Sequence, residues 1–266
     1  MKFKYKKHFG QNFLNNKNIL NSLIDAANIS KKDVILEIGP GMGILTELLA
    51  MRAKKVIAVE KDRELVAILK KKFAEVLNVK IIEGDILRIK IDELGLKKRY
   101  KIAANIPYYI TGKFLRLFLD RNNLEMRSPS PSIMVIMVQK EVAERIVAKD
   151  GKESLLSLSV KAYGTPKIIR KVPKGAFMPP PKVDSAIVQI SRISDAWFRK
   201  NKIKPDVFFA VLKSAFQQKR KTLKKSLSNL LNTHLAVSQP SDGMNEKFTK
   251  KRPEELSLDD WAQLWN

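Results

Sequence analysis

The chain has 266 residues and carries 51 Lys and Arg side chains against 27 Asp and Glu, a formal net charge of +24. This excess predicts attraction to a polyanion, either nucleic acid or an anionic membrane surface. No apolar run approaches the ~20 residues of a membrane span, and the absence of cysteine excludes disulfides and thiolate metal sites. His8 and His234 lie far apart in the sequence. We therefore expect a cytoplasmic protein with no metal and no membrane partner.

Apolar, β-rich runs alternate with amphipathic stretches over the first two thirds of the chain. Strands are predicted at residues 34–38, 56–60, 79–83, 101–105, 133–139, 165–172 and 185–193, and helices at 44–52, 64–76, 112–119 and 140–148. Such alternation predicts an α/β fold with a mostly parallel sheet covered on both faces. Only a short Pro-rich loop separates the last two strands, which predicts antiparallel pairing at one edge.

The pattern changes after about residue 192, and from Pro205 onward only helical periodicity is present. One apolar face comprises Val207, Phe208, Val211, Leu212, Ala215 and Phe216, and others comprise Leu223, Leu227, Leu230, Leu231, Leu256, Leu258, Trp261 and Leu264. Residues 196–253 hold 14 Lys/Arg against 3 Asp/Glu. That imbalance favours a phosphate-binding surface over a merely solvated helix face. We predict a larger domain at 1–194 and a basic helical RNA-binding domain at 195–266.

A glycine-rich loop, Glu37-Ile-Gly39-Pro-Gly41-Met-Gly43, directly follows the first predicted strand and opens a helix. Glycines there let the backbone approach a ligand where a Cβ would collide. The dinucleotide fingerprint is G-x-G-x-x-G, whereas the third glycine here comes one residue early. This form is more usual for S-adenosylmethionine, which has no pyrophosphate to hold. We predict that Gly39 and Gly41 bind that cofactor, and a dinucleotide oxidoreductase is the less favoured alternative.

Acidic side chains follow the next two predicted strands. Glu60 can accept both hydroxyls of a ribose, with Lys61 beside it, although such a carboxylate would serve NAD equally well. Asp85 is placed to accept a hydrogen bond from the cofactor adenine while Ile86 packs on its ring; the alternative is that Asp85 caps a short helix. Ligands of open α/β sheets bind at the carboxyl ends of the strands. We therefore expect these residues and Asn105, after the fourth strand, at one site.

The fourth strand ends in Asn105-Ile106-Pro107-Tyr108, which places an amide, a proline and an aromatic ring within four residues. The amide oxygen can accept a hydrogen bond from the exocyclic amine of a base. The ring can stack on the face of the base, which is worth about 1–3 kcal/mol. Pro107 has a fixed φ and no N–H, and so stiffens the turn. A plain strand-to-loop corner is the alternative, but the pattern is typical of a site that holds adenine.

Taken together, these motifs resemble the rRNA adenine dimethyltransferase family, in the branch that acts on the small ribosomal subunit. The resemblance covers nearly the whole chain through residues 8–14, 37–43, 60, 84–85, 105–108, 177–185 and 215–223. It implies a Rossmann-like, S-adenosylmethionine-dependent methyltransferase domain. It also implies that Asn12 and Leu14 join Asn105 around the cofactor. Finally, it implies that Tyr108 stacks on the target adenine and that Phe177 covers the other face.

The resemblance further implies the reaction and the partner. The substrate would be two adjacent adenosines in the 3′-terminal hairpin loop of 16S rRNA, in the 30S subunit or its precursor. Each 6-amino group would be methylated twice, with S-adenosylhomocysteine as the product. One alternative is the related 23S rRNA dimethyltransferase of the macrolide-resistance type, and residues 177–185 and 216–223 favour the small-subunit enzyme over it. A second alternative is an RNA-binding assembly factor without turnover. No apolar patch demands a partner, so we expect a monomer.

Overall fold

The computed structural model describes residues 11–96, 99–120, 130–149, 151–218, 221–231, 248 and 250–264, with the side chains of 228–231 left undescribed. His8, His234 and the Lys219-Arg220 pair lie outside the described residues. The chain divides into two compact units, one of residues 1–143 and 165–193, the other of 144–164 and 194–266. The predicted domains left residues 144–164 in the first domain, whereas their contacts group them with the helical unit. No described helix is long and apolar enough to cross a bilayer.

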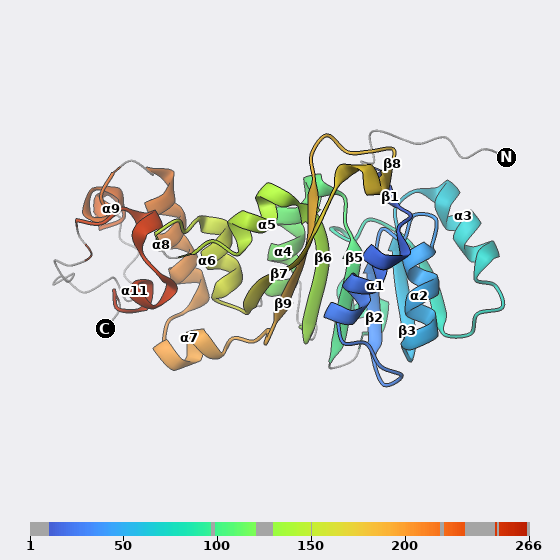
Figure 1. Cartoon of the computed structure of the whole chain (residues 1–266). Helices are drawn as coiled ribbons and strands as arrows, with labels where there is room; N and C mark the ends of the chain where they lie inside the picture. Colours follow the sequence, from blue (N-terminus) through green and yellow to red (C-terminus); the bar gives the residue numbers. More distant parts are fainter. Residues whose placement is uncertain are drawn as a thin grey trace. The chain divides into compact units, whose positions relative to one another are not determined.

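The first unit is built on a seven-stranded sheet of order β4-β3-β2-β5-β6-β9-β7 (Figure 1). Its strands are β2 (Val34–Ile38), β3 (Lys55–Glu60), β4 (Val79–Glu83), β5 (Tyr100–Asn105), β6 (Ile133–Gln139), β7 (Thr165–Val172) and β9 (Ser185–Ser191). The first five strands in this order pair in parallel, and β9 runs antiparallel to both β6 and β7. The predicted α/β class is confirmed, with the reversed strand second from the edge.

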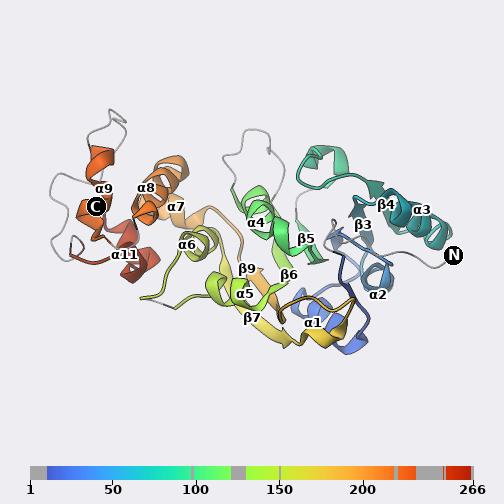
Figure 2. The same cartoon turned by 90° about the horizontal axis from the view of Figure 1, so that it is seen from above.

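Helices cover this sheet on both faces. They are α1 (Lys17–Ala26), α2 (Ile44–Arg52), α3 (Arg63–Lys72), α4 (Thr111–Leu119) and α5 (Lys140–Ile146). Figure 2 shows α1 and α2 on one side of the sheet and α4 on the other. The first helix was not predicted; it begins at Asn16, whose side chain accepts hydrogen bonds from two backbone N–H groups of the first turn. Its buried Leu20 and Leu23 pack in the same apolar cluster as Leu45 and Leu49 of α2.

A separate two-stranded ribbon joins two distant segments of the first unit. Strand β1 (Phe13–Leu14) pairs antiparallel with β8 (Phe177–Met178), so that Leu14 lies opposite Phe177. This pairing brings the N-terminal motif beside the motif at residues 177–185.

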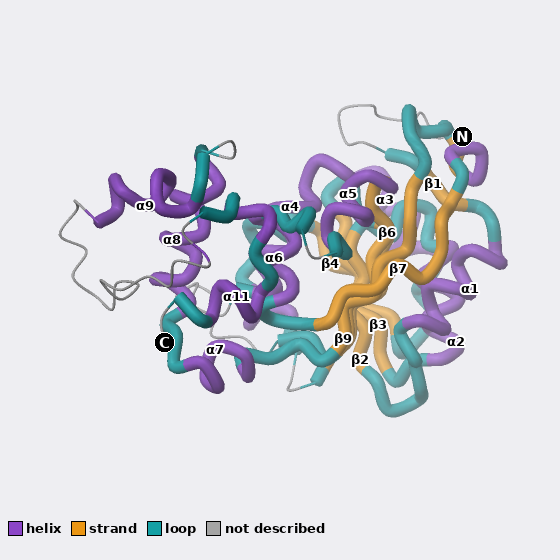
Figure 3. Tube along the Cα trace, turned by 60° about the vertical axis from the view of Figure 1, so that its left-hand side comes forward, coloured by secondary structure: helices purple, strands orange, loops and turns teal. Residues whose placement is uncertain are grey.

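The second unit is helical in its described part (Figure 3). Its helices are α6 (Leu155–Lys161), α7 (Ala196–Asn201), α8 (Pro205–Gln217), α9 (Leu223–Leu231) and α11 (Leu258–Ala262). The predicted apolar face of α8 is confirmed, because Phe208, Leu212 and Phe216 are buried and Phe216 stacks on Trp261 with ring centroids 6.3 Å apart. Leu230 and Leu231 belong to α9, but their side chains are among those not described.

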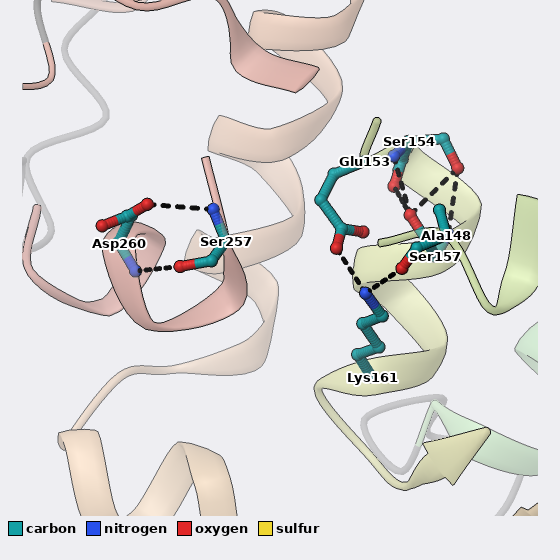
Figure 4. Close-up of polar contacts among 7 residues, drawn as sticks. All are labelled: Ala148, Glu153, Ser154, Ser157, Lys161, Ser257 and Asp260. Atoms are coloured by element: carbon teal, nitrogen blue, oxygen red, sulfur yellow. Dashed lines mark hydrogen bonds and ion pairs between the residues drawn. The ribbon is translucent and has the colours of Figure 1, made fainter. Parts of the chain in front are cut away.

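Buried polar contacts tie residues 144–164 into this unit (Figure 4). The Lys161 ammonium donates to the carboxylate of Glu153, whose side chain has no exposed surface, and to the Ala148 carbonyl. The Glu153 backbone N–H donates to the carbonyl of Glu254, 2.9 Å away. Because Glu254 lies near the C-terminus, this bond joins the inserted segment to the end of the chain.

Candidate active site

A pocket opens where the four neighbouring parallel strands β4, β3, β2 and β5 end. All predicted site residues except Phe177 line it, namely Asn12, Leu14, Gly39, Gly41, Glu60, Lys61, Asp85, Ile86, Asn105, Pro107 and Tyr108. The residues that follow these strands meet because parallel neighbours present their carboxyl ends at one edge. The structure thus brings the predicted set together, while the role of each residue stays a prediction.

The glycine loop forms the tightest part of the pocket wall. Gly39 and Gly41 have φ of +66° and +59°, a left-handed conformation that residues with a Cβ rarely adopt. A Cβ on Gly41 would lie 2.6 Å from Cε1 of Phe13, and one on Gly39 would lie 3.7 Å from the carbonyl oxygen of Asn105. The loop therefore lies against both the N-terminal motif and the Asn105 turn, and at Gly41 the Phe13 ring leaves no room for a Cβ.

Glu60 is held rigidly beside that loop. Its Oε2 accepts a hydrogen bond from the Gly41 N–H at 3.2 Å, and its Oε1 accepts from the backbone N–H groups of Lys61 and Asp62 at 2.8 and 2.9 Å. Burial raises the pKa of Glu60, and these three hydrogen bonds oppose that rise. A carboxylate offers about four acceptor positions, so the group keeps capacity for a hydroxyl donor from a ligand.

Asp85 is an ionised carboxylate that also lines the pocket. Its Oδ2 lies 3.0 Å from the Lys61 Nζ, and its Oδ1 accepts from the Leu87 N–H at 3.0 Å. Burial acts to raise the pKa of Asp85, but the Leu87 N–H and the Lys61 ammonium outweigh it and lower the pKa. The capping contact that was the alternative for Asp85 is thus present, over a turn rather than a helix, and the residue still lines the pocket.

The amide of Asn105 has a defined orientation. Its Nδ2 donates to the backbone carbonyl of Asn12 at 3.2 Å, a contact between residues far apart in the sequence. This bond uses one of the two N–H donors of the amide and fixes its orientation, so Oδ1 can serve as an acceptor for a ligand. Asn12 of the N-terminal motif therefore orients the side chain of Asn105, the last residue of β5.

Tyr108 is anchored by its phenol. The next element, η3 (Tyr108–Ile110), begins after Pro107, and the Tyr108 hydroxyl lies 2.5 Å from Oγ of the fully buried Ser185 on β9. Burial raises the pKa of the Tyr108 phenol, and the bond to Ser185 opposes the rise. The phenol therefore stays neutral at physiological pH, and its tether limits rotation of the ring.

Phe177 lies elsewhere. Its side chain is 4% exposed and packs in the apolar cluster that contains Leu14, the residue opposite it in the ribbon. It is not among the residues that line the pocket. Stacking of Phe177 on a target base would require the side chain to leave this packing, and the predicted role stays a prediction.

Several residues lie at the site without having been assigned to it from the sequence. Gln11, Phe13, Glu37 and Tyr109 also line the pocket. Glu37 is 1% exposed, burial raises its pKa to about 8, and its Oε2 has no hydrogen-bond partner among the described residues. The sequence did contain a signal for Glu37, because it is an acidic residue within an otherwise apolar predicted strand. The contact of Ser185 with Tyr108 spans 77 residues and had no local signal.

Solved structures share this fold. A dimethyladenosine transferase from Plasmodium falciparum is 30% identical, with a TM-score of 0.76 and 95% coverage of each chain. The 23S rRNA methyltransferase ErmE has a TM-score of 0.71 over 96% of this chain and 98% of its own, at 22% identity, and so shows the fold alone. Fold and pocket together define a Rossmann-like methyltransferase of the S-adenosylmethionine-dependent class.

Sequence comparisons narrow this class to one family. A family model described as ribosomal RNA adenine dimethylase matches residues 2–261. A ribosomal RNA small subunit methyltransferase A from Dehalococcoides mccartyi is 41% identical over 98% of this chain and 87% of its own. The protein of the same name from Fusobacterium nucleatum is 40% identical over 99% and 97%. The chain therefore belongs to the ribosomal RNA adenine dimethylase family, which confirms the resemblance found in the sequence.

Proposed function

We propose that this protein dimethylates the 6-amino groups of two adjacent adenosines in the 3′-terminal hairpin loop of 16S rRNA. The observation that carries the proposal is the Asn105 amide, which is oriented by a hydrogen bond to the Asn12 carbonyl and lines the same pocket as Tyr108. The choice of the small subunit over 23S rRNA is supported by the names of the relatives that are about 40% identical. The reaction would take place in the cytoplasm on the 30S subunit or its precursor, and we expect a monomeric enzyme.

The residues of the pocket fit S-adenosylmethionine. The positive φ of Gly39 and Gly41 forms a tight turn in the pocket wall, Glu60 keeps an acceptor position for a ribose hydroxyl, and Asp85 can accept from an adenine amine. When bound, the cofactor supplies an electrophilic methyl group on a sulfonium centre and leaves as S-adenosylhomocysteine. These side chains bind and orient it, and we assign no metal to the site.

The catalytic contribution of the protein is alignment. The lone pair of an adenine amine is delocalised into the ring, so correct placement of the reactants can supply much of the rate acceleration. Oδ1 of Asn105 and the backbone carbonyl of Ile106 would accept the two amine hydrogens and turn the nitrogen lone pair toward the methyl group. Pro107 keeps this turn stiff. The motif contains no histidine or lysine, and an alkylated amine loses its proton without a dedicated base.

Tyr108 would hold the face of the target base. Its tether to Ser185 fixes one edge of the ring, so the base meets a surface that is already oriented. A base paired in a duplex cannot reach this pocket, and the target must be unpaired or flipped out. The basic helical region at 195–266, with exposed Lys200, Lys204 and Lys213, would hold phosphates and set orientation, while RNA shape guides recognition.

The test is transfer of labelled methyl groups from S-adenosylmethionine to undermethylated 30S particles, 50S particles and free RNA. We expect labelling of the 30S particles, on the two adjacent adenosines. Asn105→Ala should lose transfer and keep measurable cofactor binding by calorimetry. Asn18→Ala, the same change at an exposed position of α1, is the matched control and should behave as the wild type. Labelling of 50S particles alone, or full turnover by Asn105→Ala, would refute the proposal.

A further inference from the structure

An exposed aromatic ring stands at the mouth of the pocket. Tyr109 is 60% exposed, and it is a pocket-lining residue next to the base-stacking Tyr108. The other large apolar side chains that the described residues expose to this degree, such as Met51 and Leu77, do not line the pocket. Tyr109 is therefore both exposed to solvent and part of the pocket wall.

The turn that carries Tyr109 directs its side chain outward. In a 3₁₀-helix three residues complete one turn, so Tyr108, Tyr109 and Ile110 of η3 point in three different directions. The hydroxyl of Tyr108 is bound to Ser185, and Ile110 is 7% exposed. The side chain of Tyr109 points in the third direction, toward solvent.

The backbone of this turn is fixed, although the ring itself is not. The Ile110 N–H donates to the Pro107 carbonyl at 3.1 Å, and the Thr111 hydroxyl donates to the Tyr108 carbonyl at 3.0 Å. The phenol of Tyr109, in contrast, has no hydrogen-bond partner among the described residues. The ring of Tyr109 is therefore exposed, while hydrogen bonds hold the backbone turn that carries it.

The substrate offers a matching surface. If one of two adjacent adenosines turns out of the loop into the pocket, the base beside it loses a stacking partner. An aromatic ring at the pocket mouth can replace that partner, because every base has a face that stacks on an aromatic side chain. A purine offers a larger face than a pyrimidine does.

We propose that Tyr109 stacks on the nucleotide adjacent to the target adenosine and makes the enzyme prefer a purine at that position. The inference rests on the proposed function and adds a specificity-determining residue to it. Tyr109 acts on the neighbour of the reacting base, and so it is a positioning residue whose loss affects KM more than kcat.

The test uses 30S particles reconstituted from transcribed 16S rRNA, with either the two adjacent adenosines or one adenosine beside a uridine. We expect the wild type to have a lower kcat/KM on the uridine particle, by less than the roughly 10-fold that loss of the whole stacking interaction would cost, because uridine still offers a smaller face. Tyr109→Phe should keep this preference. Tyr109→Ala should be slow on both particles and show no preference. Leu77→Ala, a change at a fully exposed side chain outside the pocket, is the control.

The outcomes separate this inference from the proposed function. If Tyr109→Ala keeps the wild-type ratio between the two particles, the ring contributes nothing to the choice of neighbour and the inference is wrong, even where 30S methylation is normal. An equal loss on both particles with the preference retained would assign Tyr109 to the cofactor wall instead and would also overturn it. Absence of methylation on every 30S particle would remove the proposed function and this inference together.

Discussion

Replacing Gly41 by alanine tests whether the glycine loop must lie directly against the N-terminal motif. Gly95 provides the reference, because its φ of +67° is similar but a Cβ there would have nothing within 4 Å. A left-handed φ costs alanine about 1–2 kcal/mol. Alanine also reduces the conformational entropy of the unfolded chain, which offsets about 0.4–1 kcal/mol of this cost. We therefore expect Gly95→Ala to lower the free energy of unfolding by about 1 kcal/mol.

Gly41→Ala adds a collision to that strain. The new Cβ would lie 2.6 Å from Cε1 of Phe13, whereas carbon atoms prefer about 3.5–4.0 Å. Overpacking of this kind costs about 1–3 kcal/mol, so the total destabilisation should reach about 2–4 kcal/mol. Phe13 must move to relieve the contact, and because it lines the pocket we also expect S-adenosylmethionine affinity to fall at least about 10-fold, or about 1.4 kcal/mol.

Urea unfolding measured by circular dichroism and by tryptophan fluorescence checks the stability change. The described tryptophans, Trp197 and Trp261, belong to the second unit. Comparing their fluorescence with circular dichroism therefore shows whether the glycine variants act on the first unit alone or on both units together. Calorimetry measures cofactor affinity in parallel. A Gly41→Ala variant that is no less stable than Gly95→Ala and binds the cofactor as tightly as the wild type would show that the glycine loop need not lie directly against Phe13.

Tyr108→Ala should slow single-turnover methyl transfer more than Tyr108→Phe, because the ring face stacks on the base and the hydroxyl only anchors it; equal losses would point to the hydroxyl. Burial raises the pKa of Glu37 from 4.5 to about 8. The neutral carboxyl therefore contributes fully to the free energy of unfolding below about pH 4.5, and this contribution is lost as the pH rises to about 8. Glu37→Gln should remove up to about 1.4 kcal/mol per pH unit from the pH dependence of urea unfolding, and an unchanged slope would contradict this. Lys161→Met should lower the stability of the second unit by about 3–5 kcal/mol, because it leaves Glu153 buried and unpaired. The double variant with Glu153→Gln should recover part of this loss in tryptophan-monitored unfolding, and a double variant as unstable as Lys161→Met would argue against the pairing.

The strands and the position of the site could be predicted because their signals are local. The bounds of β4, β6 and β7 match the predicted residues 79–83, 133–139 and 165–172, since each segment holds β-branched residues and is bounded by polar, Gly or Pro residues. A polar residue directly after a parallel strand lies at the carboxyl edge whatever the rest of the fold does. Glu60, Asp85 and Asn105 therefore meet at one pocket, as their places in the sequence predict.

Other features depend on packing between distant segments. The helix α1 has only 10 residues, and a helix of that length is stable chiefly through its packing on the sheet. The grouping of residues 144–164 with the C-terminal helices depends on the contact of Glu153 with Glu254, which no local pattern encodes. Phe177 belongs to a motif expected at the site, but its pairing opposite Leu14 buries the ring in the core.

The sequence by itself determined the class of fold and the family, and all the site residues that it named except Phe177 line the pocket. Most of them could be found because they lie within a few residues of a strand end. Only the tertiary structure decided how those side chains are held. Asn105 is oriented by Asn12, and Tyr108 by Ser185, across 93 and 77 residues. These contacts depend on the order of strands in the sheet and on the pairing of β1 with β8. Both arrangements exist only after the chain has folded.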